Sequence, residues 1–95
     1  MRLREARERA ELSQRSLGIL AGLDPSVAST RVNQYERGVH EPSYATLEMF
    51  ATHLGVPATY FFTSDDNLAT LVKCYFEASP SLKAEMLKLC RTKAI

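Results

Sequence analysis

The sequence predicts an all-α fold, and three observations support that prediction. Apolar residues recur at helical spacing through most of the chain, and Ser, Asp or Pro residues stand where those periodic segments begin. No segment alternates apolar and polar residues in the manner of a half-buried strand. With 95 residues, of which 45% are hydrophobic, the chain can bury one modest core. We therefore expect a folded domain rather than a disordered chain.

Two short helices are predicted before residue 23. Residues 2–10 form a highly charged first helix with a narrow apolar stripe. Ser13 is a good N-cap for a second helix over residues 14–21, which Gly22 ends. We expect the second helix to bury Leu17, Leu20 and Ala21.

A third helix is predicted between Asp24 and Gly38. Asp24 can cap its start, with Pro25 in the first turn, and Gly38 can adopt the positive φ that ends it. The face expected to be buried carries Ala28, Val32 and Tyr35. The opposite face is rich in short hydrogen-bonding groups, namely Ser26, Thr30, Asn33 and Arg37, flanked by Ser29 and Gln34. Such side chains read base edges in a major groove, although a solvated surface helix explains this face alone equally well.

The second half of the chain predicts four more helices. Their expected ranges are Ser43 to Leu54, Pro57 to Phe62, Ser64–Asp66 to Ala78, and Ser79-Pro80 onward. The short helix is expected to close the core with Tyr60, Phe61 and Phe62. The last two helices carry broad apolar stripes, Leu68, Leu71, Val72, Tyr75 and Phe76 on one and Leu82, Met86, Leu89 and Cys90 on the other.

The charge of the chain does not by itself indicate a nucleic-acid partner. The net charge is +1, with seven Arg and six acidic residues in 1–42 and five basic and five acidic residues in 43–95. Any DNA-binding surface must therefore come from the arrangement of a few cations, which favours a dimer that doubles the patch.

Several other classes of protein are excluded by the residues present. Cys74 and Cys90 lack metal-binding spacing, so we expect partly buried free thiols instead of a zinc site or a disulfide. His40 and His53 have no nucleophile or metal-ligand partner at motif spacing, so we expect no enzyme activity, no metal and no cofactor. No signal peptide or membrane-spanning run is recognisable, which predicts a cytoplasmic protein.

An ordered set of short motifs carries a resemblance to a known family. The motifs span residues 3–62 and are Leu12-Ser-Gln-Arg-Ser-Leu17, Leu20-Ala-Gly-Leu23, Tyr35-Glu-Arg-Gly38, Pro42-Ser43, Leu47, Leu54-Gly-Val56 and Tyr60-Phe-Phe62. In this order they resemble the lambda-repressor-like, Cro-type helix-turn-helix proteins, often called the XRE type. The resemblance implies a compact five-helix DNA-binding domain over residues 1–63, with two additional C-terminal helices in an extension over residues 64–95.

The sequence departs from the family pattern in two places. About one extra helical turn lies between Ala21-Gly22 and Tyr35-Glu36, so either the recognition helix is longer at its N-terminus or a loop bulges there. Glu11 stands where the family often has Gly or Asn, which is tolerable if that turn does not need a positive φ.

The resemblance also implies which residues meet DNA. The second helix would lie across the backbone while the third enters the major groove. The expected DNA-contacting residues are Gln14, Arg15, Ser26, Ser29, Thr30, Arg31, Asn33, Gln34, Arg37, His40 and Tyr44. Arg7 and Glu36 resemble the partly buried ion pair that orients the third helix in the family.

The predicted function is sequence-specific regulation of transcription, most simply repression, by a homodimer bound to a palindromic operator in double-stranded DNA. The C-terminal extension is expected to supply the dimer interface, which comprises Leu68, Leu71, Val72, Tyr75, Leu82, Met86 and Leu89. Neither a membrane nor a small-molecule ligand is expected. The alternative is a protein-interaction module on the same fold, antitoxin-like or an accessory regulator, with weak or no DNA binding. The near-neutral charge is its best support.

Overall fold

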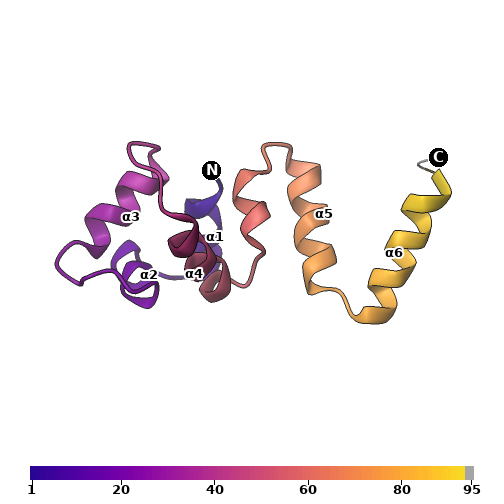
Figure 1. Cartoon of the computed structure of the whole chain (residues 1–95), viewed down its shortest axis with the longest axis horizontal. Helices are drawn as coiled ribbons and strands as arrows, with labels where there is room; N and C mark the ends of the chain where they lie inside the picture. Colours follow the sequence, from indigo (N-terminus) through magenta and orange to yellow (C-terminus); the bar gives the residue numbers. More distant parts are fainter. Residues whose placement is uncertain (94–95) are drawn as a thin grey trace.

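The structure is a computed structural model that describes residues 1–93, and within that range every regular element is a helix (Figure 1). The all-α prediction is confirmed. The helices are α1 (Leu3–Arg9), α2 (Gln14–Leu20), α3 (Ala28–Glu36), α4 (Tyr44–Leu54), the 3-10 helix η1 (Ala58–Phe62), α5 (Asp66–Glu77) and α6 (Pro80–Lys93). Residues 94 and 95, which belong to the expected C-terminal extension, lie outside the described residues.

The core lies where the first four α-helices and η1 converge. Each of these five elements contributes to the largest fully buried side chains, which are Leu3, Leu17, Val32, Phe50, Tyr60 and Phe61. The rings of Tyr35 and Phe50 meet edge to face with their centroids 6.0 Å apart. Ala69 of α5 is only 3% exposed and joins the same cluster, so α5 is attached to the N-terminal domain.

The first α-helix ends in a left-handed turn. The Leu12 N–H donates to the Arg7 carbonyl at 3.2 Å and the Glu11 N–H to the Glu8 carbonyl at 3.0 Å. This pattern requires a residue with positive φ, which is Glu11 at 58°. We expected Glu11 to be tolerated if this turn did not need a positive φ. The turn does need one, so Glu11 is strained. Glycine takes the same position at the ends of α2 and α3, as Gly22 and Gly38.

Helix α3 starts later than predicted. Asp24 does not cap it, because residues 25–27 form a turn ahead of Ala28. Oδ1 of Asp24 instead accepts hydrogen bonds from the backbone N–H and the hydroxyl of Ser26, at 2.8 and 2.6 Å. The extra residues between α2 and α3 thus form a turn, which is the second of the two alternatives that the longer spacing allowed.

Two side chains that were expected in the core are exposed. Leu20 is 43% exposed, because the buried side of α2 runs through Leu17 and Gly18 and α3 packs against that side. Phe62 is 66% exposed, because η1 directs the two preceding aromatic side chains inward and leaves this one outside.

Helices α5 and α6, called here the C-terminal arm, extend from one end of the molecule (Figure 1). The molecule measures 51 × 24 × 21 Å, and its radius of gyration is 15.3 Å. A compact chain of this length would have a radius of gyration of about 12 Å. Helix α5 packs on the domain through Ala69 and Val72. Helix α6 has no extensive packing contact with any other described helix. Val72, expected in a dimer interface, thus lies partly within the core packing.

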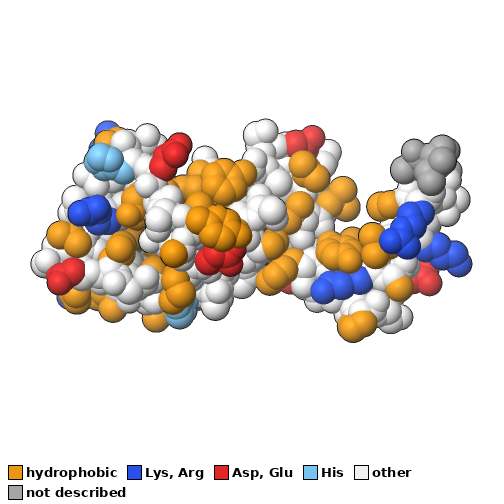
Figure 2. Space-filling model, in the orientation of Figure 1, with side chains coloured by type: hydrophobic (Ala, Val, Ile, Leu, Met, Phe, Trp, Pro, Cys, Tyr) orange, Lys and Arg blue, Asp and Glu red, His pale blue; other side chains and the backbone are white. Residues whose placement is uncertain are grey.

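The apolar side chains of the arm are largely uncovered (Figure 2). The exposed ones are Leu68, Leu71, Tyr75, Phe76, Leu82, Leu87 and Leu89. Cys74 and Cys90 are exposed as well, contrary to the expectation of partly buried thiols, because no neighbouring helix covers their sides of the arm. Among the described residues, no helix is both long enough and apolar enough to span a membrane.

Candidate nucleic-acid interface

Helices α2 and α3 pack against each other at very short range. A Cβ atom on Gly18 would lie 2.7 Å from the Cβ of Ala28 and 3.0 Å from its Cα and carbonyl oxygen. The crossing therefore requires glycine at position 18, a role that sequence analysis missed. The available signal was a glycine inside a predicted helix, where it costs stability unless packing needs it.

Glu36 links the end of α3 to α1 and α2. Nε and Nη2 of Arg7 donate to its two carboxylate oxygens at 2.6 and 3.2 Å, and Nε2 of Gln14 donates to Oε1 at 3.0 Å. The side chains of Arg7 and Glu36 are 13% and 4% exposed. Hydrogen bonding to Glu36 raises the pKa of Arg7 above its ordinary value. This arrangement orients α3 relative to both preceding helices.

Two of the expected DNA-contacting residues are held by hydrogen bonds within the protein. Gln14 is half-buried at the start of α2 and is held by its bond to Glu36. Ser13 caps the same helix by accepting from the Ser16 N–H at 3.0 Å. Ser26 donates its hydroxyl and its N–H to Asp24, which lowers the pKa of the Asp24 carboxyl. Both side chains are therefore positioned before any ligand arrives.

The outward face of α3 is exposed to solvent. The opposite face buries Ala28, Val32 and Tyr35, as predicted. Within residues 1–93, the side chains on the exposed side form no hydrogen bond or ion pair; they are Ser29, Thr30, Arg31, Asn33 and Arg37, with the half-buried Gln34 beside them. Such groups can bond to bases and phosphates without first breaking contacts inside the protein.

The arginines of residues 1–63 fall into two groups. Those on or beside α1 are paired with carboxylates: Arg2 with Glu5 and Asp66, Arg4 with Glu8, Arg7 with Glu36 and Arg9 with Glu5. The others have no carboxylate partner among the described residues and lie on α2 or α3 or at their ends; they are Arg15, Arg31 and Arg37. Within residues 1–63, the arginine charge that no carboxylate partner neutralises therefore lies on the α2–α3 surface.

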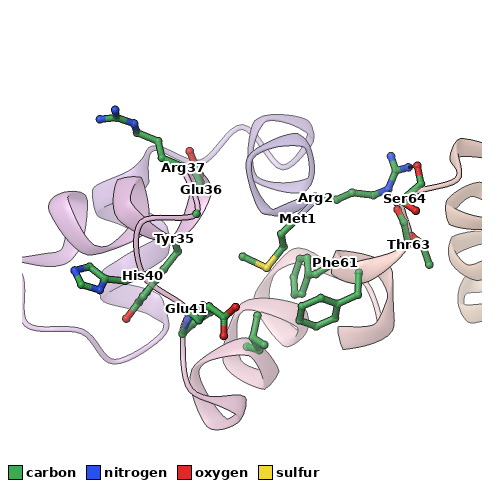
Figure 3. A pocket seen from close by; sticks show the side chains of 14 residues that line it. Met1, Arg2, Tyr35, Glu36, Arg37, His40, Glu41, Phe61, Thr63 and Ser64 are labelled. Carbon is green, nitrogen blue, oxygen red and sulfur yellow. Dashed lines mark hydrogen bonds between the residues drawn. The ribbon is translucent and has the colours of Figure 1, made fainter.

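An open groove of about 690 Å³ lies beside the C-terminal end of α3 (Figure 3). Arg37 and His40, which line one side of it, point outward. Arg2 and Glu36 also line it, but their charged groups are held in ion pairs. The groove therefore offers few of the converging free polar groups that orient a small ligand. Tyr44, just beyond it, is exposed, and the neighbouring Glu48 carboxylate raises its pKa.

Comparisons with known proteins agree with this arrangement. The family described as "Helix-turn-helix domain" matches residues 1–59, more than half of the chain. A search of curated proteins gives no match. The crystal structure of transcriptional regulator BswR is similar to this chain, with a TM-score of 0.90 and 41% sequence identity. That similarity covers 96% of this chain and 90% of the other, so it includes the C-terminal arm. The protein therefore belongs to the lambda-repressor-like helix-turn-helix family.

Proposed function

We propose that this protein is a sequence-specific DNA-binding transcriptional regulator that places α3 in the major groove and α2 across the DNA backbone. The observation that carries this proposal is the α2–α3 surface, where a row of exposed hydrogen-bonding side chains lies beside the three arginines of residues 1–63 that have no carboxylate partner. Family membership and the likeness to a transcriptional regulator support the same class of function.

The position of each side chain on α3 suggests its role on DNA. Asn33 and Gln34 are the proposed adenine readers, because an amide side chain can pair with that base through two hydrogen bonds. Ser29 and Thr30 would donate to bases or to phosphate oxygens. The proposed backbone contacts come from residues at the edges of this surface, namely Gln14, Arg15, Ser26, Arg31, Arg37, His40 and Tyr44.

We further propose that the C-terminal arm joins two copies into a homodimer. Helix α5 uses one apolar face, with Ala69, to pack on its own domain, and leaves a second face with Leu71 and Tyr75 uncovered. Helix α6 aligns Leu82 and Leu89 on an exposed stripe. Contact between such faces of two copies would remove apolar area from water and would present two α3 helices to one palindromic operator. The boundary between domain and arm would then lie near residue 63.

The proposed regulator acts most simply as a repressor, because a dimer bound to promoter DNA occludes it. The rival function is a protein-interaction module on the same fold, which the net charge of +1 favours. The two differ in their response to salt, since phosphate contacts release counterions and protein contacts generally do not.

Selection from a random DNA library with the purified full chain tests the proposal, followed by titration of the enriched sequence at two salt concentrations. We expect an inverted repeat, with half-sites one helical turn or a multiple of it apart, and an affinity that falls steeply with salt. Arg37→Ala should reduce the slope of log K against log salt by about 0.9.

The matched control is Arg4→Ala, which removes an exposed arginine of α1 that is paired with Glu8. It should leave both the affinity and the salt slope unchanged. If the folded protein enriches no sequence, or if its binding ignores salt, the interaction module becomes the better explanation.

A further inference from the structure

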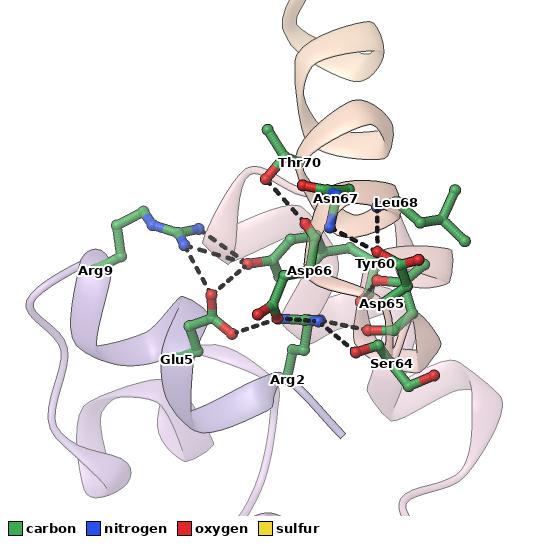
Figure 4. Close-up of polar contacts among 11 residues, drawn as sticks. Arg2, Glu5, Arg9, Tyr60, Ser64, Asp65, Asp66, Asn67, Leu68 and Thr70 are labelled. Atoms are coloured by element: carbon green, nitrogen blue, oxygen red, sulfur yellow. Dashed lines mark hydrogen bonds and ion pairs between the residues drawn. The ribbon is translucent and has the colours of Figure 1, made fainter.

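Arg2 joins the start of the chain to the start of the C-terminal arm (Figure 4). Its guanidinium donates to Oδ1 of Asp66 at 2.9 Å, to the Ser64 carbonyl at 3.0 Å and to the Thr63 carbonyl. On its other side, Nη1 donates to Oε2 of Glu5 at 3.0 Å. The side chain is only 15% exposed. One arginine thus holds both α1 and the segment that leads into α5.

The bonds from Arg2 act on the connection between η1 and α5, residues 63–65. The other side-chain bonds of this connection are local: Thr63 Oγ1 donates to the Tyr60 carbonyl at 2.8 Å, and Asp65 caps α5. Arg2 instead reaches it from 61 residues away, and its backbone N–H also donates to the Phe61 carbonyl at 3.1 Å. The direction in which the chain leaves the domain therefore depends on Arg2.

The remaining attachment of α5 to the domain is apolar. Ala69 is buried in the core cluster and Val72 packs against it. Among the described residues, every hydrogen bond between the α5 helix and the domain involves Arg2. Apolar contacts resist separation but are non-directional, whereas a charge-assisted hydrogen bond is directional. Arg2 is therefore the polar side chain of residues 1–63 that opposes tilting of α5 on the domain, in addition to the packing of Ala69 and Val72.

A small tilt of α5 displaces the far end of that helix, and with it the rest of the arm. The helix has 12 residues, which corresponds to a length of about 18 Å. A tilt of about 10° would move its far end by about 3 Å, close to the rise of one base pair, about 3.4 Å. Helices α2 and α3 lie at the opposite end of the molecule (Figure 1), so in an arm-joined dimer such a tilt changes the separation of the two α3 helices.

We propose that Arg2 is a positioning residue that sets which half-site spacing the dimer recognises, because it fixes the direction of the C-terminal arm. This inference rests on the proposed function, DNA binding by an arm-joined homodimer. Arg2 contacts no DNA in this account. It acts through the Thr63, Ser64 and Asp66 oxygens that it holds.

The test compares full-length wild type, Arg2→Ala and the control Arg4→Ala on a set of DNA duplexes. The duplexes carry the selected half-sites with the spacer shortened by one base pair, unchanged, or lengthened by one or two, and one duplex carries a single half-site. Binding is measured by titration. The mass of the free protein by sedimentation and its melting temperature are recorded for each variant.

Wild type and Arg4→Ala should prefer one spacing by about 100-fold over its neighbours, since simultaneous engagement of both half-sites is lost when the geometry does not match. Arg2→Ala should reduce that preference to below about tenfold. Its affinity for the single half-site should stay within twofold of wild type, and sedimentation should still give the mass of the dimer. A merely structural role would leave the ratio between spacings intact.

An unchanged preference for spacing in Arg2→Ala would overturn the inference, and so would an equal loss on all duplexes including the single half-site. If Arg2→Ala fails to fold, Asp66→Ala replaces it, because Asp66 is 93% exposed and its truncation removes the side-chain acceptor that Arg2 holds on the arm. The same loss of preference is expected, and an unchanged preference overturns the inference. A wild type that forms no dimer or binds no DNA would instead overturn the proposed function.

Discussion

Gly18 in α2 and Ala28 in α3 approach so closely that a side chain on the first would enter the space of the second. A Cβ placed on Gly18 would lie 2.7 Å from the Cβ of Ala28, and the backbone of Ala28 is only 3.0 Å away. Because protein interiors are close-packed, the two helices can accept a methyl group here only by moving apart. The position of α3 therefore depends on the absence of a side chain in α2.

Gly18→Ala should destabilise the protein although alanine is the better helix former. The gain in helix propensity is about 1 kcal/mol, whereas overpacking a core contact costs about 1–3 kcal/mol. The clash involves backbone atoms as well as the Ala28 methyl group, so we expect a net loss of stability and weaker DNA binding. Urea unfolding measures the first effect and titration with the selected DNA the second.

The double variant Gly18→Ala with Ala28→Gly serves as the control for that prediction. It removes the methyl group that the new side chain meets and should recover part of the lost stability and affinity. A single variant as stable as wild type would show that moving the helices apart costs no more than the gain in helix propensity.

Glu11→Gly should stabilise the protein. Glu11 has a φ of 58° in the turn that ends α1, and a non-glycine residue in this left-handed region costs about 1–2 kcal/mol. We expect urea unfolding to show a gain of about 1 kcal/mol. Glu11→Ala, which removes the same carboxylate but keeps the strain, should show no such gain. Equal effects of the two variants would assign the change to charge instead of backbone conformation.

Glu36→Gln should destabilise the protein and lower its affinity for DNA. The change leaves the largely buried Arg7 without a charged partner, and breaking a buried ion pair in this way costs about 3–5 kcal/mol. Glu8→Gln, which breaks an exposed pair with Arg4, should cost less than about 1 kcal/mol. Thermal melting and DNA titration of both variants check this. Normal melting and unchanged binding in Glu36→Gln would contradict an orienting role for the pair.

Leu71→Asp should convert the proposed dimer to a monomer without unfolding it. Leu71 is 59% exposed on the uncovered face of α5, so an aspartate there remains solvated in the monomer but would be buried in the dimer. Sedimentation should show half the mass, and affinity for the inverted repeat should fall by about 100-fold or more while single half-site binding is unchanged. Thr70→Asp, an exposed change on another side of α5, is the control. A protein that is monomeric before any substitution would exclude dimerisation through the arm.

Asp24 should make stability depend on pH in the acid range. Hydrogen bonds from Ser26 lower the pKa of Asp24 in the folded state, so the unfolded state binds the proton more tightly. Its contribution to stability is therefore complete above the ordinary pKa of about 3.9 and is lost as the pH falls through the lower folded value. Asp24→Asn can still accept the hydrogen bonds but does not titrate. Its free energy of unfolding should fall less than that of wild type over this range, and parallel curves would contradict the assignment.

Features that depend on a few neighbouring residues were predictable from the sequence. The caps at Ser13 and Ser43 and the left-handed Gly38 follow from local hydrogen bonding and backbone freedom. The buried face of α3, with Ala28, Val32 and Tyr35, follows from helical periodicity, because one apolar stripe can meet only one core. The pairing of Arg7 with Glu36, 29 residues apart, was suggested by family resemblance alone.

Other features were decided by how distant elements meet in space. Leu20 is exposed and Gly18 buried because α3 approaches α2 from the side that carries the glycine. Arg2 pairs with Asp66, which lies 64 residues later in the sequence, and no local pattern predicts a pair so far apart in the chain. The sequence by itself therefore determined most helix ends and the buried face of α3, since these depend on neighbouring residues. Tertiary packing alone decided the short crossing of α2 and α3 and the direction of the C-terminal arm, because both depend on contacts between segments far apart in the chain.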